Sequence, residues 1–126
     1  MKMILMVAMG GAIGSSFRYL FGVAATRLFG MGFPWGTLIV NIVGSFLMGV
    51  LIVLLALRYS VNNEVRAFLA IGVLGGFTTF SSFALDVVLL YERKQYFASM
   101  GYMSASVICS ILALFMGMAV VRSFTG

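Results

Sequence analysis

One short stretch of this sequence holds most of the residues that could bind or pass a ligand. Residues 72–83 read GVLGGFTTFSSF and lie within an uncharged run from Ala67 to Leu85. The paired glycines Gly75 and Gly76 weaken a helix, because glycine carries the largest backbone entropy cost. The hydroxyls that follow can hydrogen-bond to backbone groups that a helix leaves unpaired. The pattern predicts a break at the centre of an otherwise apolar helix.

A second interpretation of the same stretch stays open. Gly72 and Gly76 form a GxxxG pair, which is typical of close contact between membrane helices. A helix break in a membrane persists only where the freed backbone is buried in protein or lines a wet cavity. We favour the break, because the weak helix propensity and the hydroxyl cluster coincide.

Further polar side chains lie in apolar stretches, and nearly all of them can donate hydrogen bonds. Phe80 and Phe83 add ring edges with partial positive charge, and Arg18 adds a full charge deep in the first stretch. Such a set suits an anion better than a cation, which would need carbonyl or carboxylate oxygens. The acidic residue nearby is Asp86. The donors are Asn41, Ser45, Thr78, Thr79, Ser81, Ser82, Tyr102, Ser106 and Ser110.

Two of these residues have purely structural alternatives. Asn41 shares a helix face with Ser45 and Gly49 at four-residue spacing, and spacing alone favours a contact between helices over a ligand-binding role. A deep arginine costs on the order of 3 kcal/mol on insertion scales. Arg18 therefore either snorkels to the nearer interface or lines an aqueous vestibule.

The composition places these residues in a membrane. The chain has 126 residues, of which 63% are hydrophobic and 9% are charged, unlike a soluble domain of this size. Its apolar stretches match the roughly 20 residues of a spanning helix. They predict an all-α membrane protein with four transmembrane helices, the third broken at its centre. A single four-span domain covers residues 1–126, with spans at about 3–28, 37–57, 67–90 and 96–121.

The composition also excludes several classes of function. The sequence has no His and a single cysteine, Cys109, which rules out a disulfide within the chain and leaves no cluster for a transition metal. The net charge is +5, but the basic residues are scattered at span ends, as is usual at membrane interfaces. We expect no nucleic-acid partner, and no constellation supports an enzyme.

The charge placement predicts how the spans are oriented. With four spans, the N-terminus, the loop at 58–66 and the C-terminus share one side, and the basic residues there nearly balance those on the other side. The positive-inside rule then sets no orientation, so both orientations and an antiparallel dimer of opposed copies are expected. Four short helices also enclose too little volume for a pathway, so an oligomer is expected on this separate ground. One side carries Lys2, Arg58, Arg66 and Arg122, and the other carries Arg27, Arg93 and Lys94, with Arg18 if it reaches outward.

Three motifs resemble, in the right order, signatures of the Fluc (CrcB) fluoride channels. They are residues 75–83, residues 11–19 (GAIGSSFRY) and residues 34–41 (PWGTLIVN), and the resemblance covers essentially the whole chain. It implies a fluoride-selective channel that passively exports fluoride across the cell's inner membrane, as a multi-pass protein in lipid, and lowers cytoplasmic fluoride toxicity. It also implies a dual-topology homodimer with two pathways. Pairing with a second, homologous subunit remains open.

The resemblance assigns roles to individual residues. Structural Na⁺ at the dimer interface is held by backbone carbonyls that correspond to Gly75 and Thr78, and Arg18 and Asp86 belong to the vestibule. Asn41 moves from a helix contact to the pathway. Leu114 departs from the family pattern, since relatives often have Thr there, and Asp86 stands where some have Glu. The anion pathway comprises Asn41, Thr79, Phe80, Ser81, Ser82, Phe83, Tyr102, Ser106 and Ser110.

The main alternative is a small proton-coupled multidrug exporter, which is also a dual-topology dimer of four-helix subunits. Such an exporter needs a carboxylate inside the membrane, typically in its first span, to couple protons. Spans one and two contain no acidic residue. A purely structural membrane subunit is the second alternative, and it would not need the stripe of donors.

Overall fold

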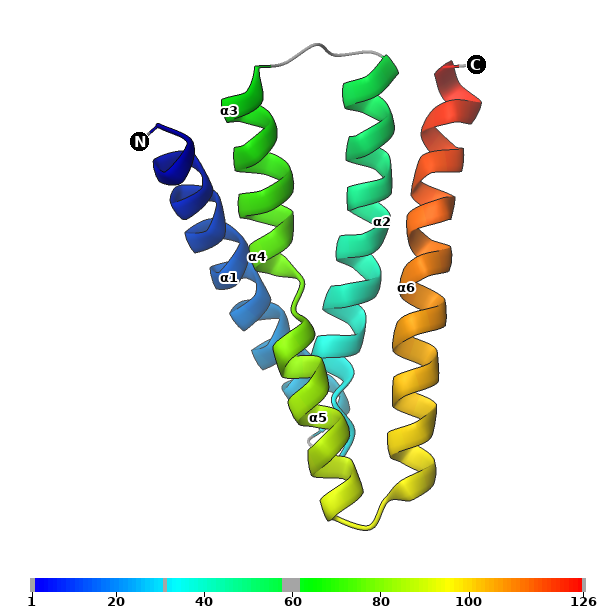
Figure 1. Cartoon of the computed structure of the whole chain (residues 1–126). Coiled ribbons are helices and arrows are strands. Elements are labelled where there is room, and N and C mark those ends of the chain that lie inside the picture. The colour runs from blue at the N-terminus through cyan, green and yellow to red at the C-terminus, as the bar shows by residue number, and fades with distance from the viewer. Residues whose placement is uncertain (1, 31, 58–61, 126) are drawn as a thin grey trace.

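The structure, a computed structural model, describes residues 2–30, 32–57 and 62–125. All regular secondary structure in these ranges is helical (Figure 1). Four segments are long and apolar enough to cross a membrane: Lys2–Phe29, Trp35–Ala56, Asn63–Glu92 and Tyr96–Phe124. The prediction of an all-α protein with four candidate membrane-spanning helices is confirmed, and the chain is a multi-pass membrane protein.

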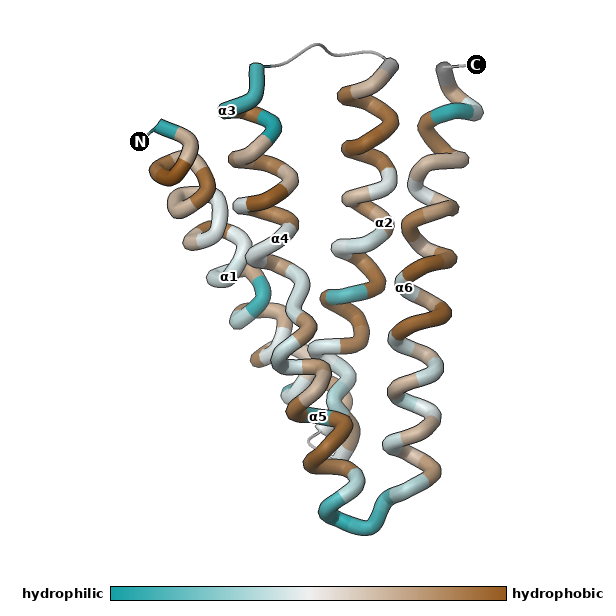
Figure 2. The backbone as a smooth tube through the Cα atoms, viewed as in Figure 1, coloured by the Kyte–Doolittle hydropathy of each residue, from teal (hydrophilic) through white to brown (hydrophobic). Residues whose placement is uncertain are grey.

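The first, second and fourth segments are single helices. They are α1 (Lys2–Phe29), α2 (Trp35–Leu57) and α6 (Tyr96–Thr125). Both chain ends lie at one end of the bundle, together with the end of α2 and the start of α3 (Figure 1). Hydrophilic residues gather at the two ends of the bundle, and hydrophobic residues dominate between them (Figure 2). This distribution fits a membrane-embedded bundle.

The third segment is a bent series of joined helices. It comprises α3 (Asn63–Arg66), the π-helical η1 (Ala67–Leu74), α4 (Gly75–Phe77) and α5 (Phe80–Glu92). Between α4 and α5, Thr78 (φ −83°, ψ 159°) and Thr79 (φ −153°, ψ 126°) have extended backbones. We call residues 75–80 the bend. It lies at the predicted position, where two glycines and two β-branched threonines disfavour continuous helix.

Close glycine contacts bring α1 against the first half of this segment. A Cβ built on Gly72 would lie 2.8 Å from the Gly10 Cα, and one on Gly76 would lie 2.9 Å from the Gly11 carbonyl oxygen. The GxxxG pair therefore does make a close helix contact, as the alternative interpretation expected. The close contact and the bend coexist in one segment.

Glycines also set the approach of α2 to α6. Added methyl groups would collide with the Leu114 carbonyl at Gly49 and with the Phe46 carbonyl at Gly117. The two helices therefore run side by side along much of their length, as Figure 1 shows. This pairing brings the hydroxyl-bearing face of α6 toward Asn41 on α2.

Candidate functional site

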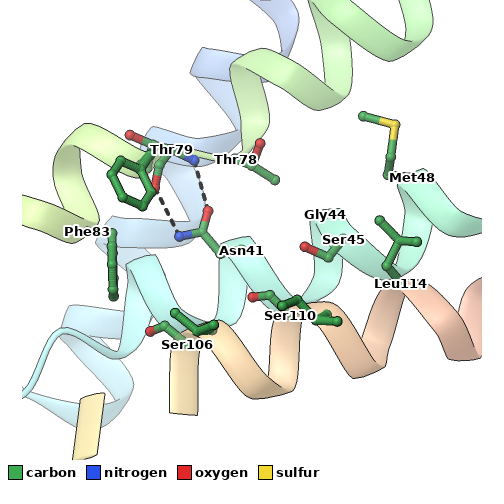
Figure 3. A pocket seen from close by; sticks show the side chains of 13 residues that line it. Asn41, Gly44, Ser45, Met48, Thr78, Thr79, Phe83, Ser106, Ser110 and Leu114 are labelled. Atoms are coloured by element: carbon green, nitrogen blue, oxygen red, sulfur yellow. Dashed lines mark hydrogen bonds between the residues drawn. The ribbon is translucent and has the colours of Figure 1, made fainter. Parts of the chain in front are cut away.

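The Asn41 side chain pairs with the backbone of the bend. Its Nδ2 donates to the Thr79 carbonyl at 3.0 Å, and its Oδ1 accepts from the Thr79 N–H at 2.8 Å (Figure 3). One carboxamide thus satisfies both backbone polar groups of an extended residue. Gly44, one turn further along α2, faces Thr78 so closely that an added methyl would collide with it. Because Gly44 has no side chain, the bend can pack close to α2, and Asn41 can then reach Thr79.

The bend is also bonded from α1 and from its own hydroxyls. Arg18 Nε donates to the Gly76 carbonyl at 3.2 Å. Thr78 Oγ1 and the Thr78 N–H both donate to the Leu74 carbonyl at 3.0 Å. Thr79 Oγ1 accepts from the Ser82 N–H at 3.2 Å and so caps the start of α5.

A cavity of about 310 Å³ lies between the bend, α2 and α6 (Figure 3). One wall carries the aromatic rings of Phe80 and Phe83, and Met48 and Leu114 also contribute apolar surface. Six predicted pathway residues line it: Asn41, Thr79, Phe80, Phe83, Ser106 and Ser110.

Two serines on α6 line this cavity, and their hydroxyls have no partner among the described residues. In the part of the chain that the structure describes, Ser106 Oγ and Ser110 Oγ are buried and make no hydrogen bond. Buried polar atoms in native proteins nearly always have a partner, and exceptions often mark a ligand or water site. The contrast is Ser99 on the same helix, whose buried hydroxyl donates to the Val87 carbonyl at 3.1 Å. The two unpartnered hydroxyls indicate a place for a hydrogen-bond acceptor.

The two phenylalanines differ in their surroundings. Their ring centroids are 5.5 Å apart with planes at 48°. Phe83 is 8% exposed and contacts the Tyr102 ring at 5.3 Å, whereas Phe80 is 76% exposed. Within one chain, Phe83 is therefore part of the hydrophobic core, whereas the Phe80 side chain is largely exposed.

A second cavity of about 640 Å³ holds Arg18 and Ser82, and it shares Thr79 with the first cavity. Arg27, Thr26 and Thr37 also line it. Arg18 therefore lines this cleft and also bonds the bend, and its vestibule role stays a prediction. Ser81 is exposed, with its Oγ 3.3 Å from Thr79 Oγ1.

Tyr102 and Asp86 form a pair away from the first cavity. The fully buried Tyr102 donates its hydroxyl to Asp86 Oδ2 at 3.0 Å. Asp86 lines a third cavity, of about 680 Å³, together with Thr37, Glu92 and Arg93.

Thr37 was not among the predicted site residues, although it lines both the second and the third cavity. It lies four residues before Asn41, on the same face of α2. The four-residue spacing from Asn41 could therefore have identified Thr37 from the sequence.

Four membrane-crossing segments, three of which line a small cavity with buried hydroxyls, are typical of a membrane transport protein for a small solute or ion. The chain belongs to one family of this class: residues 5–118 match the family described as CrcB-like protein, Camphor Resistance (CrcB).

Close relatives cover nearly the whole chain. A protein from Agrobacterium fabrum is 58% identical over 120 residues, which span 95% of this chain and 96% of the relative. One from Chelativorans sp. is 54% identical with the same coverage. One from Caulobacter vibrioides is 50% identical over 123 residues, covering 97% of each. All three relatives are named fluoride-specific ion channel FluC.

The unpartnered hydroxyls predict an unusual stability change. Replacing Ser110 with Ala should leave the free energy of unfolding unchanged or raise it by ~1 kcal/mol, because a buried unsatisfied group is removed. Ser99→Ala is the matched control on the same helix and should lower it by ~1 kcal/mol, because a made hydrogen bond is lost. Denaturation in detergent without fluoride measures both. A loss at Ser110 as large as at Ser99 would mean that the Ser110 hydroxyl has a structural partner.

Proposed function

We propose that this chain is the subunit of a fluoride channel, which lets fluoride leave the cell passively across the inner cell membrane. Family membership and three relatives named as fluoride-specific ion channels support the proposal. The observation that carries it is that Ser106 and Ser110 line the cavity and that their buried hydroxyls have no partner among the described residues. Donors without partners are ready to replace the water that a small anion must shed.

The chemistry of the cavity favours an anion. Ser106 and Ser110 can donate, and Asn41 keeps one N–H beyond the one that Thr79 uses. Glu64, Asp86 and Glu92 are the acidic residues of the chain, and none is among the described residues that line the cavity. A proton-coupled exporter would need a carboxylate there, so transport is expected to be passive.

Phe80 and Phe83 would complete the pathway between the hydroxyls of the first cavity and those of the second cavity. Ring edges attract an anion electrostatically, while the apolar wall keeps out a continuous column of water. Arg18 would attract anions into the second cavity, where Ser82 and Thr79 offer hydroxyls. Asp86 would orient Tyr102 at the other end, through the bond between them.

An antiparallel homodimer would complete this pathway. Phe80, which lines the first cavity, is 76% exposed. A second copy could cover its ring. Because the basic residues on the two sides of the membrane nearly balance, the copies could insert in opposite orientations. Pairing with a homologous subunit is the other arrangement that would close the site.

We further propose that the bend is a true break of the third span and that it holds a structural sodium ion at the dimer interface. In a continuous helix the Gly75 carbonyl would accept from the Thr79 N–H, which instead donates to Asn41. The Thr78 carbonyl would accept from the Ser82 N–H, which donates to Thr79 Oγ1. Both carbonyls have thus lost their helical donors, and carbonyl oxygens are the hard ligands that suit such a cation. When bound, sodium would supply a fixed positive charge that joins the two copies.

The proposal predicts selective and passive fluoride efflux. Liposomes that contain only this protein should release fluoride down its gradient, with or without a proton gradient, while they retain chloride. Ser110→Ala should slow the efflux, because one donor to the anion is lost. A fluoride electrode and a chloride electrode in parallel measure the two fluxes. Chloride release as fast as fluoride release would refute the proposal.

Replacing Phe80 with Ile tests the role of the ring. The change keeps much of the apolar bulk but removes the ring edge, so fluoride flux should fall roughly tenfold or more, the effect of losing about 1.4 kcal/mol of ion stabilisation. The dimer should stay intact on size exclusion. Phe97→Ile is the matched control, because Phe97 is 92% exposed on α6 and outside the three cavities. Equal flux in both variants would reduce Phe80 to a packing residue.

Dual topology is tested by labelling single cysteines. The exposed native Cys109 is first replaced with Ala, and one cysteine is then added at either terminus. A membrane-impermeant thiol reagent should label about half of the protein from each face, because the basic charge favours neither orientation. One-sided labelling of a preparation that conducts fluoride would rule out the antiparallel dimer.

A further inference from the structure

We infer that Asn41 and Arg18 are positioning residues for the bend: their side chains fix its backbone and so determine which carbonyls remain free for a cation. The inference rests on the sodium site proposed above. It adds that the ion site is built by side chains from α1 and α2, although its ligands come from the third span.

Asn41 acts on Thr79. Its carboxamide makes both hydrogen bonds that a neighbouring strand would make to this extended residue, at 2.8 and 3.0 Å. By accepting from the Thr79 N–H, it withdraws the donor that a helix would offer to the Gly75 carbonyl. The same side chain lines the first cavity. Asn41 therefore links the wall of the anion pathway to the geometry of the bend.

Arg18 acts on the next carbonyl along. Its Nε donates to Gly76 across 58 residues of sequence, and the close contact of Gly76 with Gly11 brings α1 near enough for this bond. A guanidinium stays charged and offers only donors. It therefore occupies the Gly76 carbonyl and makes that oxygen a poorer cation ligand. The carbonyls of Gly75 and Thr78, whose helical donors bond elsewhere, are left for a hard cation.

A simpler assignment gives both residues roles toward the anion alone. Asn41 would then serve as a donor in the pathway, and Arg18 would supply positive potential in the second cavity. On that assignment, changing either residue would reduce fluoride flux but leave the backbone of the bend and its response to sodium unaltered. Flux therefore cannot separate the two assignments, and the readouts must report on the bend.

The first readout is hydrogen exchange of the Thr79 amide in the intact protein. The sequence contains five threonines, so ¹⁵N-threonine labelling gives a simple spectrum, in which Thr79→Ser identifies the Thr79 signal. In Asn41→Leu the Thr79 amide should exchange roughly tenfold faster than in wild type, because its acceptor is gone. Ser45→Ala is the matched control, since Ser45 lies one turn away on α2 and lines the same cavity. It should leave the exchange rate unchanged.

The second readout is thermal unfolding of the detergent-solubilised protein as sodium replaces potassium. Wild type should gain stability with sodium, and Asn41→Leu should need a higher sodium concentration for the same gain. Arg18→Lys should show the same shift, because it keeps the charge but lacks the Nε donor. This second variant keeps the test open if Asn41→Leu fails to fold.

The outcomes of these two experiments test separate parts of the inference. Unchanged Thr79 exchange in a folded Asn41→Leu protein would overturn the positioning role of Asn41. Faster exchange with an unchanged sodium response would overturn the selection of carbonyls. A wild-type protein that is indifferent to sodium would remove the proposed ion site itself, while the exchange rate would still report on the bond between Asn41 and Thr79.

Discussion

The structure depends on one constraint: backbone groups inside hydrocarbon need hydrogen-bond partners. The extended residues Thr78 and Thr79 join two helices near the middle of a bent membrane segment. Side chains supply most of the hydrogen-bond partners that these backbone groups need. Asn41 bonds both backbone groups of Thr79, Arg18 bonds the Gly76 carbonyl, and the Thr79 hydroxyl caps α5. The bend is stable because residues distant in sequence complete it.

Packing brings those residues within reach. Gly76 against Gly11 draws α1 to the bend, and Gly44 leaves room for Thr78 against α2. On the other side of α2, Gly49 lies directly on the Leu114 carbonyl of α6. This contact aligns Ser106 and Ser110 with the cavity, and it places the apolar Leu114 side chain at the cavity's end. The hydroxyl stripe therefore stops at Ser110, one turn before the apolar Leu114.

Sequence patterns predicted the local features well, because they depend on neighbours along the chain. The four apolar segments follow from length and hydropathy, and the bend follows from paired glycines beside threonines. The hydrogen bonds between distant residues could not be predicted from the sequence, since Asn41 bonds Thr79 across 38 residues and Arg18 bonds Gly76 across 58. Such contacts depend on how each helix is rotated about its axis. The predicted pathway residues consequently divide between the first and second cavities, while Ser81 and Tyr102 line neither, and Tyr102 bonds Asp86 instead.

Hydrogen bonds divide the polar residues into those that are bonded within the fold and those that have no partner among the described residues, a division that spacing alone could not give. Ser99 and the Thr79 hydroxyl are bonded to backbone groups, so they stabilise the fold. Ser106 and Ser110 have the same chemistry and comparable shielding, yet they have no partner among the described residues. Asn41 belongs to both groups, because two bonds hold the bend and one N–H remains. Under the proposed function, a side chain in that position would couple the shape of the backbone to the anion that passes it, so that neither could change independently.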